Sequence, residues 1–368
     1  MEWRNYHIYY TDIDRLLLEC VAPFLRTLNR RLEIYFWERH YAGGPHLRVR
    51  FYGPAGSLDP VCQEFLSAVE NYLKLFPSHP ITTYSRDDAR QMLEMEGESW
   101  DPGDLEYRVN AIIPCPYLRL QSRFVEGEGL RLLHGFLRDS NPLTETMLKD
   151  PTTKLEQLLR LYFLNALVIR DDLVQGSVSF KSHWSGFAAG FPIRPAIERI
   201  RRSFDEQKAR IISTMLDVQE AYTRRDFSND PMLEKWLGLF ERYGTEARTL
   251  LLNGAQISST MTKHEVSKYR ESLKEHGQEE NEFMQTLLSD ERFVAAFSHE
   301  QTLAWPRVLI NLLYMIIPAL GLTVLDKMAL CYFAHRAVEI HFECDLTDVL
   351  RNNISAVLKS HPPSTAQR

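Results

Sequence analysis

One short segment, residues 31–53, constrains the fold more than any other part of the chain. It reads RLEIYFWERHYAGGPHLRVRFYG. Two runs of β-branched and aromatic residues within it, 33–37 and 47–52, lie on either side of a Gly-Gly-Pro turn. Such runs around a glycine-rich turn are typical of two adjacent antiparallel strands. The sequence therefore predicts a β-hairpin here.

The second strand of this hairpin has an apolar face and a polar face, because successive side chains of a strand point to opposite sides. Arg48 and Arg50 fall on the polar face, and His46 lies just past the turn. A guanidinium group held by a sheet can bind a carboxylate, a phosphate or an amide oxygen in a fixed geometry. The same alternation is also typical of an ordinary half-exposed strand, so the pattern alone leaves both interpretations open.

Composition and charge exclude several classes of protein. A chain of 368 residues can bury a large core, as one large domain or as two packed halves. The net charge of −6 provides no global positive field that would attract nucleic acid, so we expect no nucleic-acid partner. The basic residues 30–31 and 199–202 are interpreted as solvated helix faces.

The cysteines and the apolar segments indicate where the protein works. The five cysteines are scattered and form no CxxC pair, which predicts a reducing compartment and neither a disulfide framework nor a metal site. The N-terminus has no signal-peptide pattern. Residues 308–325 are apolar but contain Asn311, Pro318 and Gly321, which favours a buried helix over a membrane span. We expect a soluble, cytoplasmic protein without a membrane partner.

The order of expected elements predicts an α+β fold. A strand at 6–10, a helix at 13–30, the hairpin and a helix at 60–75 suggest an antiparallel sheet with helices on one face. Residues 78–111 are expected to form loop and short strands, 114–128 a strand and loop, and 129–138 a helix that ends near 140–142. Further helices are expected at 155–172, 195–223, 232–252, 262–289, 307–325 and 325–343. This predicts a single body over 1–368, with an α+β half at 1–150 and a mainly helical half at 151–345.

Common catalytic motifs are absent. The chain contains neither GxGxxG nor GxxxxGK[ST], and neither GxSxG nor HExxH. The sequence therefore does not support assignment to four common classes: dinucleotide-dependent enzymes, P-loop enzymes, hydrolases with a nucleophile elbow, or zinc proteases. Polar residues are instead spread over several segments, which fits a site assembled from distant parts of the chain.

The hairpin sequence GGPHLRVRF resembles the signature of the C-terminal elimination domain of class I lantibiotic dehydratases and its free-standing relatives in thiopeptide biosynthesis. Segments 116–124, 179–184 and 310–321 are similar to later segments of that family. The resemblance extends over residues 3–339. It implies an elimination-domain-like α+β fold for the whole chain.

The chain departs from this family where elimination chemistry needs a base and an acid. Leu120 stands where the family has a glutamate, and Tyr314 stands where it has a histidine. Residues 125–126 replace a pair of glycines, and residues 318–319 replace Asn-Arg. Because glutamate elimination requires groups that move protons, the chain is expected to keep the scaffold without that chemistry.

The resemblance then implies a pyridine synthase of thiopeptide biosynthesis. Such an enzyme acts without a cofactor on a precursor peptide that carries two dehydroalanines and a leader. It promotes a formal [4+2] cycloaddition, and loss of water and of the leader peptide then makes the ring aromatic. Upstream dehydratase enzymes are implied partners. Two alternatives stay open: a stand-alone lyase that eliminates glutamate from glutamylated Ser or Thr, and a non-catalytic protein that binds the precursor.

The resemblance also implies site residues. Tyr314 is expected to donate or accept a proton, with His183 or His46 as its partner. The expected substrate-binding residues are Arg48, Arg50, Arg123, Ser182, Trp184, Asp87 and Asp88. From the sequence pattern alone, Tyr314 is as consistent with core packing as with a catalytic role. The pattern favours core packing for His183, a helix cap for Ser182 and a solvated loop for Asp87 and Asp88.

Overall fold

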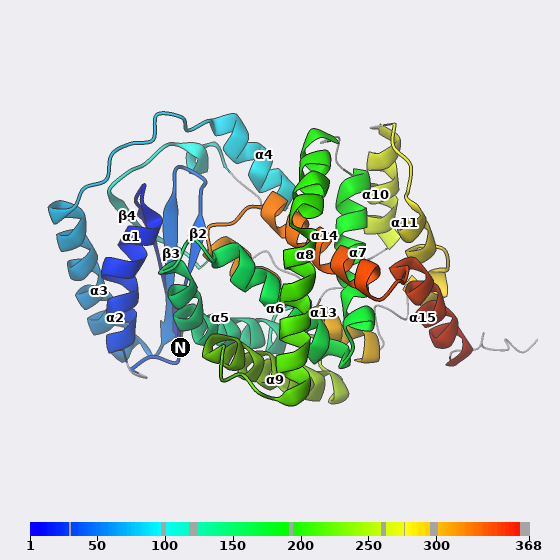
Figure 1. Ribbon diagram of the computed structural model, residues 1–368. Helices are drawn as coiled ribbons and strands as arrows, with labels where there is room; N and C mark the ends of the chain where they lie inside the picture. Colours follow the sequence, from blue (N-terminus) through cyan, green and yellow to red (C-terminus); the bar gives the residue numbers. More distant parts are fainter. Residues whose placement is uncertain are drawn as a thin grey trace, which may run out of the picture. The chain divides into compact units, whose positions relative to one another are not determined.

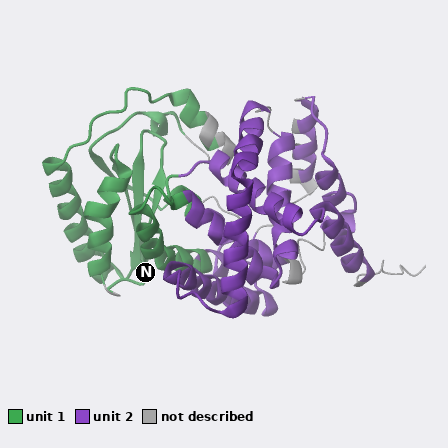
Figure 2. Ribbon diagram, in the orientation of Figure 1, with its two compact units in different colours: residues 1–122, 131–154, 315–321 green, residues 123–130, 155–314, 322–368 purple. Residues whose placement is uncertain are grey.

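The computed structural model describes residues 1–28, 31–96, 101–117, 124–190, 194–258, 263–275, 277–294 and 301–360. The chain divides into two compact units (Figure 2). Unit 1 comprises residues 1–122, 131–154 and 315–321, and unit 2 comprises 123–130, 155–314 and 322–368. That the chain forms one body with a boundary near residue 150 stays a prediction.

Unit 1 is built on a four-stranded antiparallel sheet. Its strands are β1 (Glu2–Tyr9), β2 (Ile34–His40), β3 (His46–Gly53) and β4 (Ala111–Cys115), in the order β2-β3-β1-β4. The turn between β2 and β3 needs glycine: Gly43 and Gly44 have φ of +74° and +108°, a region that side chains disfavour. The predicted hairpin is thereby confirmed.

Helices cover the apolar face of this sheet (Figure 1). They are α1 (Ile13–Leu16), a π-helical turn (Leu17–Val21), α2 (Ala22–Thr27) and α3 (Ala55–Leu75). Phe65 of α3 contacts the rings of Tyr6 in β1 and Phe51 in β3, at centroid distances of 5.9 and 5.0 Å. Burial of these apolar side chains drives the packing of helix on sheet. The predicted α+β class is confirmed.

Helix α5 (Glu128–Leu148) binds the edge of the sheet through a side-chain amide. The Asn141 Oδ1 atom accepts a hydrogen bond from the backbone N–H of Trp37 in β2 at 3.2 Å. The expected end of this helix near 140–142 is wrong. Beyond Pro142 the helix continues far enough to bury Met147 and Leu148, and tertiary packing of this kind outweighs the local cost of a proline.

Residues 78–111 contain a helix, and not only loop and short strands as expected. Helix α4 (Arg86–Glu96) begins where the Ser85 hydroxyl accepts a hydrogen bond from the backbone N–H of Asp88, and a 3₁₀ turn follows at Pro102–Leu105. Ala89 and Leu93, one helical turn apart, are buried against Leu105. The apolar pair is too short a pattern to stand out among the charged residues around it.

Unit 2 is helical. Its helices are α6 (Lys154–Arg170), α7 (Leu173–Gly190), α8 (Arg194–Arg224), α9 (Pro231–Leu252), α10 (Lys263–Glu275), α11 (Glu282–Leu287), α13 (Gln301–Ala319), α14 (Val324–His341) and α15 (Leu346–Ser360), and α13 ends in residues assigned to unit 1. Helix α7 is central, because it contacts α10, α11, α14 and α15. A Cβ atom on Gly176 would lie 2.2 Å from the carbonyl oxygen of Ala166, so glycine allows α7 to pack closely on α6.

One expectation for this unit is wrong, and two of its helices were missed. Helices α7 and α15 were not predicted. The single helix expected at 262–289 is two helices, α10 and α11, because Gly277 takes φ of +62° and Asn281 caps the second helix. Among the described residues, no helix is long and apolar enough to cross a membrane.

Candidate active site

Five side chains of unit 2 form a cluster around Tyr314, here called the Tyr314 cluster. Its members are Tyr162 of α6, His183 of α7, Tyr314 of α13, and Lys327 and Cys331 of α14. The Tyr314 hydroxyl oxygen lies 3.2 Å from the Cys331 sulfur. The His183 ring meets the Tyr314 ring edge-on, with centroids 4.8 Å apart. The Lys327 ammonium lies 5.2 Å from the centre of the same ring, which places a cation beside the phenol.

The Tyr314 cluster has an open side and a closed side. His183 is exposed and Tyr314 and Lys327 are half-buried, whereas Tyr162 and Cys331 are inaccessible to solvent. Lys327 and Cys331 are four residues apart, so they lie on one face of α14. His183 is therefore the member of the cluster that is most accessible to solvent, while Cys331 and Tyr162 contact Tyr314 from the interior.

Burial keeps the hydroxyl and thiol groups of this cluster protonated. Burial raises the pKa of Tyr314 well above its ordinary value, and the neighbouring Cys331 and Tyr162 raise it further. Burial likewise raises the pKa of the Cys331 thiol to about 11. Near neutral pH, Tyr314 is therefore a neutral phenol that can donate a hydrogen bond, and not a phenolate base. Which of the two predicted proton-transfer roles it has stays a prediction.

The His46 ring in β3 has one nitrogen that could accept a hydrogen bond. The His46 ring is 1% exposed and stacks near His7 and Tyr9, at centroid distances of 4.9 and 4.5 Å. Its Nδ1 lies 2.9 Å from the carbonyl oxygen of Gly44, which assigns the proton to Nδ1. Its Nε2 has no hydrogen-bond partner among the residues that the structure describes. Burial and the charge of Arg48 hold the pKa of His46 well below its ordinary value, so Nε2 is a neutral acceptor.

The two arginines of β3 have different environments. Arg50 is 1% exposed, and its guanidinium lies 2.9 Å from a carboxylate oxygen of Glu38 and 5.1 Å from the centre of the Tyr117 ring. Arg48 is half-buried, and its backbone lies opposite His7 in β1. Of the two, Arg48 is the more accessible. A substrate would have to compete with Glu38 for Arg50.

The remaining predicted residues are scattered. Trp184 is 5% exposed and packs on Tyr332 at a ring distance of 4.6 Å, so it lies in the core of unit 2. Ser182 is within α7, and its interpretation as a helix cap is wrong because the helix continues on both sides of it. Asp87 and Asp88 are exposed in the first turn of α4, where negative charge stabilises a helix.

The structure thus brings Tyr314 and His183 together within unit 2. Three other candidates, His46, Arg48 and Arg50, lie together within unit 1. Arg123 lies outside the described residues, and so does Leu120. In the described part of the chain, no group of three His, Cys, Asp or Glu side chains is arranged to hold a metal ion.

Sequence analysis missed Tyr162, Lys327 and Cys331. The spacing of Lys327 and Cys331 was a usable signal, because two chemically active side chains one turn apart on a helix share a face. Tyr162 gave no signal, since it lies in a helix in which ten residues of seventeen are buried and apolar side chains surround it. Only the packing of α6 against its neighbours shows its role.

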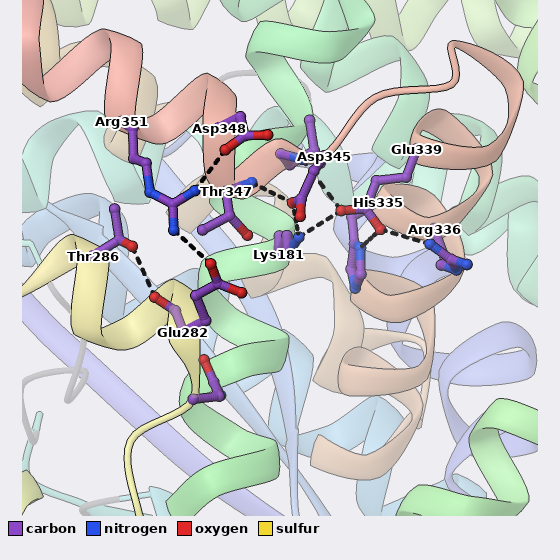
Figure 3. Close-up of polar contacts among 12 residues, drawn as sticks. Lys181, Glu282, Thr286, His335, Arg336, Glu339, Asp345, Thr347, Asp348 and Arg351 are labelled. Atoms are coloured by element: carbon purple, nitrogen blue, oxygen red, sulfur yellow. Dashed lines mark hydrogen bonds and ion pairs between the residues drawn. The ribbon is translucent and has the colours of Figure 1, made fainter.

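A second polar cluster in unit 2 joins α7, α14 and the start of α15 (Figure 3). The Lys181 ammonium lies 2.6 Å from Glu339 and 2.7 Å from Asp345. Glu339 also lies 3.2 Å from Arg336 and 3.5 Å from the Nδ1 atom of His335. The side chains of Glu339 and His335 are 6% and 4% exposed, whereas those of Arg336 and Asp345 are 44% and 51% exposed, so the network has a buried centre and an exposed edge.

This network predicts a loss of stability in acid. Burial opposes ionisation, but the neighbouring His335 and Lys181 lower the pKa of Glu339 to about 2, and hydrogen bonds from Lys181 and Thr347 lower that of Asp345 to about 2. A carboxyl with a lowered pKa stabilises the fold above its ordinary pKa, near about 4, and this contribution is lost as the pH falls toward 2. We expect the urea midpoint to fall between about pH 5 and 2.

The matching measurement is a urea titration at several pH values on the wild-type protein and on Glu339→Gln. The variant should be less stable at pH 7 and show a flatter dependence on pH. Equal slopes for both proteins would show that other groups cause the acid sensitivity.

Fold and site together define an α+β protein with a helical unit that carries the Tyr314 cluster. The chain belongs to the family described as lantibiotic biosynthesis dehydratase C-term, whose model matches residues 3–338. The resemblance drawn from the hairpin motif is thereby confirmed.

Solved structures show the same fold. The pyridine synthase TbtD from thiomuracin biosynthesis is similar with a TM-score of 0.68 and 18% identity, over 93% of this chain and 99% of that one. TsrL is similar with a TM-score of 0.66 and 14% identity, over 95% and 98% of the two chains. No curated protein matches this sequence.

Proposed function

We propose that this protein acts in thiopeptide biosynthesis as a pyridine synthase. Its substrate would be a precursor peptide with a leader and two dehydroalanines. The enzyme would join the two alkenes in a formal [4+2] cycloaddition that closes a macrocycle. Membership of the family and the fold shared with a pyridine synthase support this proposal. The observation that carries it is the contact between the ring of Tyr314 and the ring of the exposed His183, which meet edge-on.

The proposed chemistry balances without an oxidant or a reductant. One amide first takes its iminol form, which makes a 2-azadiene. The two carbon termini of the diene then form two C–C bonds with the second alkene, and the diene nitrogen, already bonded to two carbons, becomes the ring nitrogen. Loss of water and expulsion of the leader as an amide remove the remaining saturation and yield the pyridine. Each step moves only protons and neutral leaving groups, which side chains can do.

Tyr314 is assigned the proton transfers. A donor that remains protonated at neutral pH can deliver a proton to the leaving hydroxyl or to the leaving amide nitrogen. His183, exposed at the edge of the Tyr314 ring, is assigned to return that proton. The Lys327 ammonium beside the ring favours negative charge on the phenol while the proton is away.

Arg48 is assigned to hold a peptide carbonyl of the substrate. Its half-buried guanidinium can donate hydrogen bonds to a carbonyl oxygen. The His46 Nε2 atom is inaccessible to solvent, so it is assigned no contact with the substrate. Holding the two alkenes at reacting distance can lower the barrier by up to about 7–11 kcal/mol in ideal cases, so binding of this kind is itself catalytic.

The test is mass spectrometry of the purified protein with two synthetic precursors. One carries two dehydroalanines at a spacing that allows macrocycle formation, and the other carries glutamyl-serine. Loss of water with release of an intact leader amide from the first establishes the proposal. Loss of glutamate from the second, with the first unchanged, would show a lyase. Binding of both without a change in mass would show a non-catalytic binding protein.

Two arginine variants separate binding from folding. Arg48→Ala should weaken binding of the dehydroalanine precursor about tenfold, because a charged hydrogen bond is lost, and leave the urea midpoint near that of the wild type. Arg50→Ala should lower the free energy of unfolding by about 2 kcal/mol, because Glu38 is left buried without this partner. Fluorescence anisotropy and urea unfolding measure the two effects. The reverse pattern would place the substrate on Arg50.

A further inference from the structure

We propose that Cys331 is a positioning residue that aims the Tyr314 hydroxyl, an inference that rests on the proposed function. The Cys331 sulfur lies 3.2 Å from the Tyr314 oxygen and is fully buried. One turn earlier on α14, Lys327 lies over the ring of the same tyrosine. Helix α14 therefore contacts both the hydroxyl and the ring of Tyr314.

The direction of this hydrogen bond determines what Tyr314 can do. A phenol oxygen both donates and accepts, and a thiol can do the same. If the thiol donates, the Tyr314 O–H remains available to point at a substrate. A hydroxyl that accepts one hydrogen bond also donates a stronger one, because hydrogen bonds in a chain polarise each other. We assign donation from the Cys331 S–H to the Tyr314 oxygen in the working enzyme.

The surroundings of the thiol support this role over a reactive one. Cys331 is inaccessible to solvent, and burial keeps its thiol protonated. A nucleophilic cysteine needs an accessible thiolate, so Cys331 is not assigned a covalent role. The neighbouring Tyr162 hydroxyl donates to the backbone oxygen of Lys327 at 3.4 Å, which also ties this region to α14.

The experiment compares Cys331→Ala and Cys331→Ser in the full chain, with the dehydroalanine precursor as substrate. The alanine variant should lower kcat about tenfold and leave KM within about twofold, because orientation and not binding is lost. The serine variant should recover most of the rate, because its hydroxyl can donate the same hydrogen bond. Cys62→Ala is the matched control: Cys62 is also buried and hydrogen-bonds a buried tyrosine, Tyr6, but it lies in unit 1.

Each outcome decides the proposal. Recovery by serine, with the control at the wild-type rate, supports it. Equal losses in alanine and serine, or a loss in the Cys62 control as large as in Cys331→Ala, would show a packing effect and overturn it. If Cys331→Ala matches the wild type while Tyr314→Phe is inactive, the positioning role is wrong and the proposed function stands. If Tyr314→Phe retains full rate, the assigned role of Tyr314 fails, and the role of Cys331 with it.

Discussion

Replacing Tyr314 by phenylalanine should lower turnover of the dehydroalanine precursor by about 100-fold or more, with binding unchanged. The variant removes only the hydroxyl, so the ring contacts with His183 and Tyr162 remain. Because burial keeps this hydroxyl protonated, its loss removes a proton donor and leaves the shape of the site intact. Single-turnover mass spectrometry measures the rate, and anisotropy with a labelled precursor measures binding.

The matched control is Tyr269→Phe. Burial also raises the pKa of Tyr269, to about 12, and this residue packs in a different part of unit 2, against the apolar cluster around Phe283. Its loss should leave the rate within about twofold of the wild type, as expected of a substitution away from the reacting atoms. Equal effects of the two variants would mean that buried tyrosines matter here for packing. A fall in binding with an unchanged rate would instead favour a protein that only carries the precursor.

The second large effect is expected at Lys181. Lys181→Met should lower the free energy of unfolding by about 3 kcal/mol, because it leaves the Glu339 carboxylate buried with one ion-pair partner fewer. The methionine side chain fills a similar space, so packing is largely kept. Urea unfolding at pH 7 measures the loss. The loss of stability arises because the buried Glu339 carboxylate keeps its charge but loses a partner. The Lys181–Glu339 ion pair as a whole need not stabilise the fold.

Arg351→Met serves as the control from the same region (Figure 3). Arg351 pairs with Glu282 and Asp348, whose side chains are 68% and 66% exposed. Exposed ion pairs contribute about 0–1 kcal/mol, so this variant should be nearly as stable as the wild type. The double variant Lys181→Met with Glu339→Leu should recover part of the loss, because no buried charge remains. If Lys181→Met is no less stable than Arg351→Met, burial does not determine the strength of this network.

Several elements could be predicted because their signals are local. The alternation of residues 47–52 predicts a strand with two distinct faces, and the Gly-Gly-Pro turn fixes where it meets its partner. The helix expected at 195–223 is observed as α8 at Arg194–Arg224, since its apolar residues repeat at helical spacing over many turns. Helix α7 escaped prediction because glycine and serine residues weaken its helical pattern, and contacts with its neighbours stabilise it instead.

The sequence by itself determined the hairpin, the α+β class and the family. These features follow from residues that are close together in the chain or from a short motif with a defined residue order. Only the tertiary structure decided which side chains meet.

Tyr314, His183 and Cys331 come from three separate helices, and the burial that keeps Tyr314 protonated is produced by all of them together. Arg48 and Arg50 have the same pattern in the sequence, yet only the fold pairs Arg50 with Glu38 and covers it with Tyr117. Helix and strand periodicity is set by backbone geometry, whereas solvation and hydrogen bonding depend on every element that packs nearby.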